Sequence, residues 1–192
     1  MESDAKSDHG IRAFGAGQGF TVGAGGDHSV TSEELRSVVT FPLRVIPGEL
    51  GAVLHMIRPD SSQEQVGEVY FSEVEPGVIK GWKNHRRMTQ RIAVPVGEVI
   101  FYTIDRRSES GNETSREMFR LGREENYKLL VIPPGVWYAF ANVSGNTSVV
   151  ANAPDSPHEP GEIIRKDLTA KEFAEELKEL RRALSLVTTV EE

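Results

Sequence analysis

Short segments rich in Val, Ile, Phe and Tyr dominate the chain between residues 36 and 152, and they restrict its possible folds more than any other feature. They read SVVTFPLRVI, GAVLHMI, EVYFSEV, RIAVPV, EVIFYTI, YKLLVI, WYAFANV and SVVAN. Turn signals such as Pro47-Gly48, Pro76-Gly77 and Pro134-Gly135 separate them. Because no helical pattern lies between them, about eight strands at this spacing predict a closed or sandwiched antiparallel architecture.

The flanking segments differ from this β-rich region. Residues 1–35 are rich in Gly, Ser and Asp and predict a flexible arm, because such a segment buries too little apolar surface to offset the entropy of ordering. Residues 36–165 form the predicted β domain, and residues 166–192 a C-terminal helix and tail. In this helix Thr169 and Glu172 predict a capping box. The apolar residues recur at helical spacing and predict a stripe that packs on the barrel or on a partner subunit: Phe173, Leu177, Leu180 and Leu184.

Composition excludes several kinds of site. The chain has no Cys, which rules out disulfides, zinc thiolates and thiol nucleophiles. Its net charge of −7 argues against nucleic acid and anionic membranes as partners. No apolar run approaches the length of a membrane span, and the polar N-terminus does not resemble a secretory signal. We therefore expect a cytoplasmic protein.

Two spaced motifs lie within the β-rich region, at residues 77–97 and 133–142. They resemble the two motifs of the cupin family, in which four positions carry the metal ligands His, His, Glu and His. In this chain those positions are Lys83, His85, Gln90 and Tyr138. Only His85 keeps the residue type of the family. The resemblance implies a cupin jelly roll, the double-stranded β-helix whose two Greek keys carry the motifs, and a site that has lost its metal.

Strand alternation places Lys83 and His85 on one face, which we expect to point into the barrel. Gln90 joins them from beyond the next turn, and Tyr138 from the second motif. A cationic Lys repels a divalent ion, Gln is a weak neutral ligand, and Tyr must first lose its proton. The four side chains are therefore a poor metal set, and we predict neither a metal nor another cofactor.

The same side chains suit proton transfer. Burial and the nearby Lys80, Arg86 and Arg87 disfavour the charged form of Lys83, so its pKa is expected to fall. Lys83 is the candidate base, Tyr138 the candidate acid or hydrogen-bond donor, and His85 the residue that orients them. The alternative is a polar cavity in which Lys83 only binds an anion.

Basic residues cluster around the predicted strands although the whole chain is acidic. They are Lys80, Arg86, Arg87, Arg91, Arg106 and Arg107. A positive mouth on an acidic protein predicts a small anionic ligand such as a phosphorylated metabolite. We assign Lys80, Arg86, Gln90 and Arg107 to substrate binding. The alternative for each cation is ordinary surface charge.

Three blocks in order, GVIKGWKNH, VPVGEVIFYTIDRRSES and KLLVIPPGVWYAF, resemble the dTDP-4-dehydrorhamnose 3,5-epimerase family of nucleotide-sugar cupins over about residues 36 to 165. The resemblance implies catalysis without metal. The base His of the family falls on Lys83, its substrate-binding Arg on Lys80, and its later His on Tyr138. The catalytic Tyr of the family falls near Ala151, which indicates a divergent branch lacking the usual His and Tyr.

The resemblance implies an epimerase or isomerase, a homodimer, that acts on a dTDP- or other NDP-4-keto-6-deoxy sugar in surface polysaccharide biosynthesis. Two alternatives stay open at this stage. One is a non-catalytic cupin that binds a nucleotide sugar, and the other is a metal-dependent cupin with unusual ligands.

Overall fold

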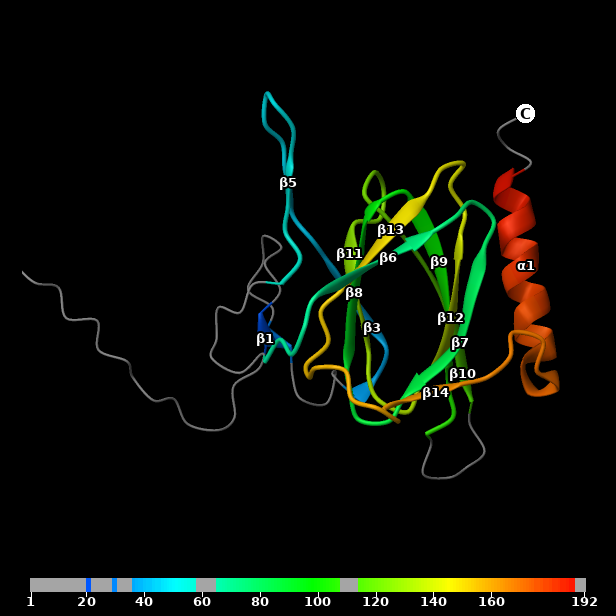
Figure 1. Ribbon diagram of the computed structural model, residues 1–192. Helices are drawn as coiled ribbons and strands as arrows, with labels where there is room; N and C mark the ends of the chain where they lie inside the picture. Colours follow the sequence, from blue (N-terminus) through cyan, green and yellow to red (C-terminus); the bar gives the residue numbers. More distant parts are fainter. Residues whose placement is uncertain (1–19, 22–28, 31–35, 58–64, 108–113, 189–192) are drawn as a thin grey trace, which may run out of the picture.

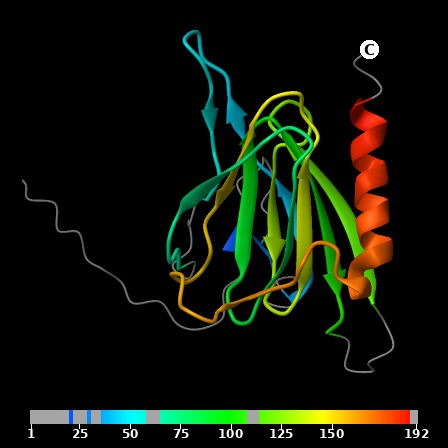
Figure 2. The ribbon, with the colours of Figure 1, turned by 45° about the vertical axis from the view of Figure 1, so that its right-hand side comes forward.

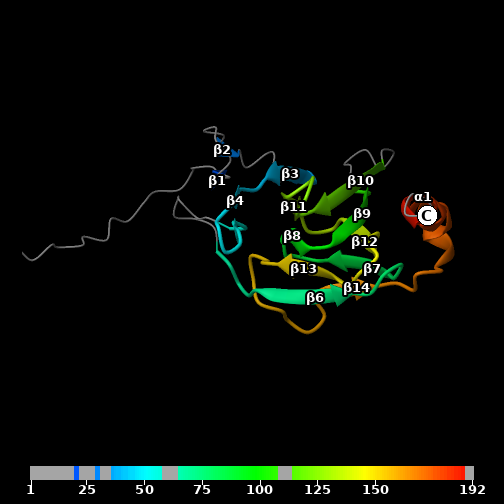
Figure 3. The same ribbon diagram turned by 90° about the horizontal axis from the view of Figure 1, so that it is seen from above.

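Two five-stranded antiparallel sheets lie face to face in the computed structural model, with the C-terminal helix outside one of them (Figures 1 and 3). The structure describes residues 20–21, 29–30, 36–57, 65–107 and 114–188. In spatial order, the first sheet contains β10 (Ser115–Gly122), β9 (Glu98–Asp105), β12 (Trp137–Asn142), β7 (Ile79–His85) and β14 (Ile163–Arg165). The second contains β3 (Val39–Pro42), β11 (Lys128–Ile132), β8 (Gln90–Val96), β13 (Ser148–Asn152) and β6 (Tyr70–Val74).

The chain crosses repeatedly between the two sheets, from β7 to β8 to β9 and from β11 to β12 to β13. This order is that of a jelly roll, and it confirms the predicted fold class. The core between the sheets comes from alternate residues of both. It contains Val74, Ile92, Val94, Val99, Phe101, Leu121, Leu130, Ile132, Val136, Tyr138, Phe140 and Val150. The residues between these on each strand face outward.

A 3₁₀ turn (Lys171–Phe173) and helix α1 (Ala174–Thr188) cover the outer face of the first sheet (Figure 2). The predicted apolar stripe packs there against Ile100, Tyr102, Ile104, Ala139 and Ala141. Phe173 lies between two tryptophans, with its ring centroid 4.6 Å from that of Trp82 and 5.2 Å from that of Trp137. The stripe therefore packs on the barrel, which was one of the two predicted locations.

The predicted capping box is wrong. The helical segment begins after Ala170, which makes no side-chain capping bond. Both the backbone N–H and the hydroxyl of Thr169 donate to the Asp167 carboxylate instead. Glu172 lies 3.5 Å from the Lys166 ammonium in an ion pair. An Asp two residues earlier in the chain competes successfully for the donors of Thr169.

C-terminal to residue 35, two strands were absent from the sequence prediction, β10 and β14. β10 reads SREMFRLG and pairs with β9 over eight residues, but half of its residues are polar and it lacks the Val and Ile signal. β14 has only three residues. In addition, the first predicted run divides into β3 and β4 (Val45–Ile46), and β4 pairs with β5 (Val53–Leu54) in a projecting hairpin (Figure 1).

Most of the predicted N-terminal arm lies outside the described residues. Within it, β1 (Phe20–Thr21) and β2 (Ser29–Val30) pair antiparallel. Across the part of the chain that the structure describes, none of the helices has the length and apolar character needed to span a membrane.

Candidate functional site

A β-bulge in β7 sets the inward face of that strand. Lys83 pairs with Tyr138 and Lys80 with Phe140, so Gly81 and Trp82 together oppose only one residue of β12. A Cβ on Gly81 would lie 2.4 Å from the Cβ of the opposing alanine, so only glycine fits there. Cross-strand partners share a side of the sheet, and both β12 partners belong to the inner core. Lys80 and Lys83 therefore face the interior, as predicted for Lys83.

His85 and Tyr138 contact each other inside the barrel. Both are 3% exposed, and the His85 Nε2 and Tyr138 Oη atoms are 3.3 Å apart. Their rings are nearly parallel, with centroids separated by 6.1 Å. Burial lowers the pKa of His85 to about 4, so its imidazole is neutral near pH 7. Burial also raises the pKa of Tyr138.

Lys83 is half-buried, and its Nζ atom lies 5.3 Å from the centroid of the Phe140 ring. Its pKa is lowered, first by burial and then by the positive charges of Arg165 and Lys80. The lowered pKa agrees with the sequence prediction. The sequence prediction did not include the charge of Arg165. This residue lies on β14, directly across from Lys83 in the register of the two strands.

A chain of hydrogen bonds lines the facing sheet. Gln90 is 1% exposed, and its Oε1 accepts from the Asn152 amide at 2.6 Å. The same amide donates to the Tyr70 hydroxyl at 2.7 Å. Tyr70 alternates with the inward Val74 on β6, so its ring faces the interior at the edge of the sheet. Burial is the largest cause of the raised pKa of Tyr70.

These residues form one polar cluster between the sheets. The charges and phenols of the site interact electrostatically: Arg165 lowers the pKa of Lys83 and His85, and Tyr70 adds to the raised pKa of Tyr138. Within the described residues, the buried side-chain atoms that lack a hydrogen-bond partner are His85 Nδ1 and Gln90 Nε2. Both belong to this site.

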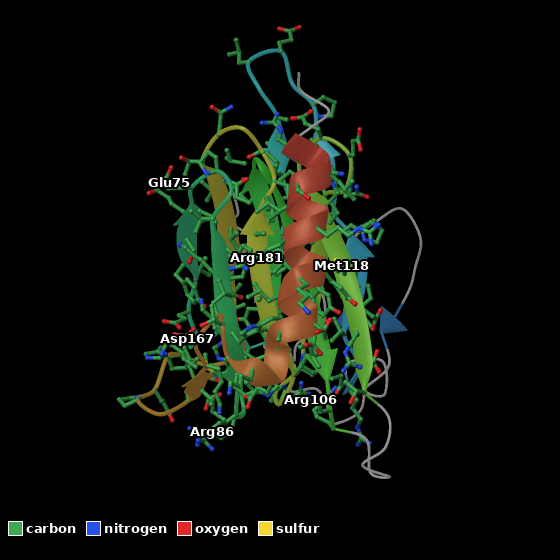
Figure 4. The ribbon with its side chains drawn as sticks, turned by 90° about the vertical axis from the view of Figure 1, so that its right-hand side faces the viewer. Glu75, Arg86, Arg106, Met118, Asp167 and Arg181 are labelled. Carbon is green, nitrogen blue, oxygen red and sulfur yellow. The ribbon has the colours of Figure 1, made fainter. Side chains whose placement is uncertain are left out.

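Two predicted substrate contacts have other partners. Arg107 donates to Asp105 and to the carbonyl oxygens of Pro134 and Arg36. Arg86 donates to the carbonyl of Gly161 and lies at the end of the molecule (Figure 4). Their roles in binding stay predictions. Lys80 does face the cavity, and its Nζ donates to a carbonyl of β6, the Glu73 oxygen.

Sequence reasoning missed Tyr70, Asn152 and Arg165. Tyr70 and Asn152 stand in predicted strands, so alternation with apolar neighbours could have placed them inside. Arg165 could not have been found in this way, because its three-residue strand carries no recognisable pattern.

The described residues contain no group of three or more His, Cys, Asp or Glu that could hold a metal ion. The side chains at the four motif positions also fit a metal poorly, since Lys83 would repel it and Gln90 already uses its oxygen. That the protein works without metal stays a prediction.

The jelly roll, with the residues of both motifs directed into its interior, defines this protein as a cupin. Its structure is similar to that of a dTDP sugar isomerase of Desulfovibrio desulfuricans G20, with a TM-score of 0.66 and 47% identity over 70% of this chain and 86% of the other. The chain belongs to the dTDP-sugar epimerase and isomerase family of cupins. No family model matches it.

One more distant solved structure shares the fold, and two curated proteins are related in sequence. A dTDP-4-dehydrorhamnose 3,5-epimerase of Bacillus anthracis, solved with TDP and pyrophosphate, has a TM-score of 0.62 at 17% identity, over 73% of this chain and 84% of the other. In sequence, the chain is 24% identical to a probable low-salt glycan biosynthesis epimerase of Haloferax volcanii, over 62% of this chain and 78% of that protein. It is 28% identical to the spore coat polysaccharide biosynthesis protein SpsL of Bacillus subtilis, over 57% and 76% respectively.

Proposed function

We propose that this protein epimerises or isomerises an NDP-4-keto-6-deoxy sugar, with dTDP as the favoured nucleotide, in surface polysaccharide biosynthesis. The observation that carries the proposal is a lysine of lowered pKa that faces a polar interior together with a neutral imidazole and two phenols. The similarity to a dTDP sugar isomerase supports the substrate class. The similarity to glycan and spore coat biosynthesis proteins supports the pathway.

Lys83 is the proposed base. A lysine can accept a proton only in its neutral form, and burial together with Arg165 and Lys80 favours that form. The carbon next to a ketone is acidic enough for such a base, because the carbonyl oxygen takes the negative charge. The ammonium that Lys83 then becomes can return the proton to the same face of the sugar.

Tyr70 is the proposed second proton-transfer group. It belongs to β6, in the sheet opposite the one that carries Lys83, and the Asn152 amide holds its oxygen. A proton removed by Lys83 on one face and replaced by Tyr70 on the other inverts the carbon. A proton returned by Lys83 itself leaves the configuration unchanged. Proton-transfer groups on opposite sheets therefore favour epimerisation.

The cations near Lys83 suit the phosphates of a nucleotide sugar. Lys80 and Arg165 are close enough to Lys83 to lower its pKa, and both would attract an anion while Lys83 itself is neutral. Arg165 is exposed at the edge of the sheet, where a diphosphate could remain partly solvated. The homodimer stays a prediction.

The test is deuterium wash-in from solvent at C3 and C5 of TDP-4-keto-6-deoxyglucose, followed by analysis of the configuration of the product. The proposal predicts exchange at one or both carbons and inversion at an exchanged carbon. Bound ligand with no exchange would contradict it.

The second candidate is a non-catalytic nucleotide-sugar binding protein, which the convergence of Lys80, Lys83 and Arg165 also favours. Removing the charge of Lys83 separates the two candidates. In a binding protein, Lys83→Ala weakens the affinity for the sugar nucleotide, and wild type shows no exchange. In an enzyme, Lys83→Ala abolishes exchange at saturating ligand.

A further inference from the structure

An aromatic ring lies beside the ammonium group of Lys83. The Nζ atom is 5.3 Å from the centroid of the Phe140 ring, within the range at which a cation is attracted to the face of an aromatic ring. Among the residues that the structure describes, Lys83 makes no ion pair and no side-chain hydrogen bond. A charge that is buried without such partners is costly, so this ring has an effect beyond filling the core.

The bulge in β7 brings the lysine and the ring together. In the register with β12, Tyr138 lies opposite Lys83, and Phe140 lies opposite Lys80. Phe140 is therefore a diagonal neighbour of Lys83 on the inward face of the sheet, at a separation that a long side chain can bridge.

Packing fixes the orientation of the Phe140 ring. Its side chain is 4% exposed. Its centroid is 5.2 Å from that of Phe101, with 26° between the ring planes, and 6.4 Å from that of Tyr138, with 17° between the planes. A ring held in this way by close-packed neighbours presents the same face to Lys83 in every molecule.

The titratable groups that act on Lys83 or lie beside it are positive or neutral. Arg165 from β14 and Lys80 from β7 are positive, and together with burial they lower the pKa of Lys83. The Glu162 carboxylate acts on His85 instead, and backbone N–H groups of the 86–89 turn donate to it. Because of burial, the groups that are neutral near pH 7 are His85, Tyr138 and Tyr70. The Phe140 ring is thus the neighbour that favours the ammonium form.

We propose that Phe140 is a positioning residue, which stabilises the ammonium form of Lys83 through the face of its ring and so makes Lys83 a stronger base. This inference rests on the proposed function. When the Nζ lone pair takes the proton from the carbon next to the ketone, the C–H electron pair stays on the sugar as an enolate and Nζ becomes positive. The ring stabilises this charge, and it holds Nζ where the proton can be returned to carbon.

The test is the pH profile of deuterium wash-in for wild type and Phe140→Leu, at saturating TDP-4-keto-6-deoxyglucose. Leu keeps the position apolar and buried but has no ring. The inference predicts that the pKa of the rate falls by about 1 in Phe140→Leu, because the ammonium loses its partner. A weaker base is neutral at lower pH but removes a proton more slowly. The two profiles should therefore cross, with Phe140→Leu about 3-fold faster below the pKa and about 3-fold slower above it. An unchanged pKa, or slower exchange at every pH, overturns the inference.

Phe119→Leu is the matched control. Phe119 packs against the same core from β10, and the strands β9 and β12 lie between β10 and β7. This substitution should lower the melting temperature and leave the pKa of the rate at the wild-type value. If it shifted the pKa as much as Phe140→Leu does, the shift would come from any loss of core packing, and the inference would be wrong.

NMR of the protein without ligand separates this inference from the proposed function. With ¹³C-labelled lysine, the ε-methylene protons of Lys83 can be assigned by their absence in Lys83→Met. The Phe140 ring should shift them upfield in wild type, and they should return to the ordinary value in Phe140→Leu. Unshifted protons in wild type overturn the inference, even where Phe140→Leu does not fold. Shifted protons on a protein that binds the ligand without wash-in overturn the proposed function and support the contact.

Discussion

Burial, more than any single neighbouring charge, sets the protonation of His85. Desolvation is the largest cause of its lowered pKa, and the carboxylate of Glu162 offsets only part of it. Lys83 and Arg165 act in the same direction as burial. A histidine in this position works as a neutral hydrogen-bonding group and not as a cation.

The free energy of unfolding should depend on this histidine at acid pH. Above pH 6.5 the imidazole is neutral in both states. As the pH falls from 6.5 to about 4, the unfolded chain takes up a proton that folded His85 does not, so stability is lost. His85→Gln should reduce the loss between pH 7 and pH 4 by on the order of 2 kcal/mol, measured by urea unfolding. An unchanged pH dependence would show that His85 is not held neutral.

Tyr70→Phe should separate exchange from inversion. The variant keeps Lys83, so deuterium should still enter the substrate, but the product should retain its configuration and net epimerisation should fall by about 100-fold or more. Product analysis by NMR measures both. Tyr102→Phe is the control, because this phenol faces helix α1 and donates to Glu179 outside the cavity. Inversion at the wild-type rate in Tyr70→Phe would exclude Tyr70 from proton transfer.

At the scale of elements, β7 has two different faces because of its neighbours. Trp82 packs outward on the helical segment, and Lys83 and His85 face the other sheet. Simple alternation predicted this from the sequence. It did not predict the bulge at Gly81, which brings Lys80 to the inner side as well. A bulge depends on the register with β12, and one strand's sequence does not contain that register.

Phe173→Ala should destabilise the protein by about 3–5 kcal/mol, because it removes a buried ring between Trp82 and Trp137. Thermal and urea unfolding measure the loss. Leu186→Ala, on the same helix but 61% exposed, should change stability by no more than about 0.5 kcal/mol. Equal effects of the two substitutions would mean that the helix does not anchor the outer face.

At the scale of the whole molecule, a chain of net charge −7 gathers several positive groups around Lys83. Lys80 and Lys83 could be proposed from the sequence because the first motif contains both. Tyr70 and Arg165 come from β6 and β14, which lie on opposite sheets and on either side of the motifs in sequence. Only the tertiary structure shows that all four lie near one another, so the sequence predicted the fold better than the arrangement of these residues.

This charge distribution predicts that the phosphates of the ligand contribute most of the binding energy. dTDP at one hundred times its Kd should stabilise the protein by about 2.7 kcal/mol, and thymidine at the same concentration by much less. The effect of dTDP should decline as salt is added, because ions screen the attraction. Differential scanning fluorimetry with both ligands measures this. Equal stabilisation by thymidine and dTDP would contradict a phosphate site at these cations.

The most direct test of the account is the pH profile of deuterium wash-in, measured on protein dialysed against EDTA, for wild type and Lys83→Met. We expect the wild-type rate to rise with pH through a pKa below the ordinary lysine value of 10.5, since neutral Lys83 is the base. Lys83→Met should still bind dTDP and show no exchange above the solvent background. Wild-type exchange in Lys83→Met, or exchange that requires an added divalent ion, would contradict a metal-free lysine base.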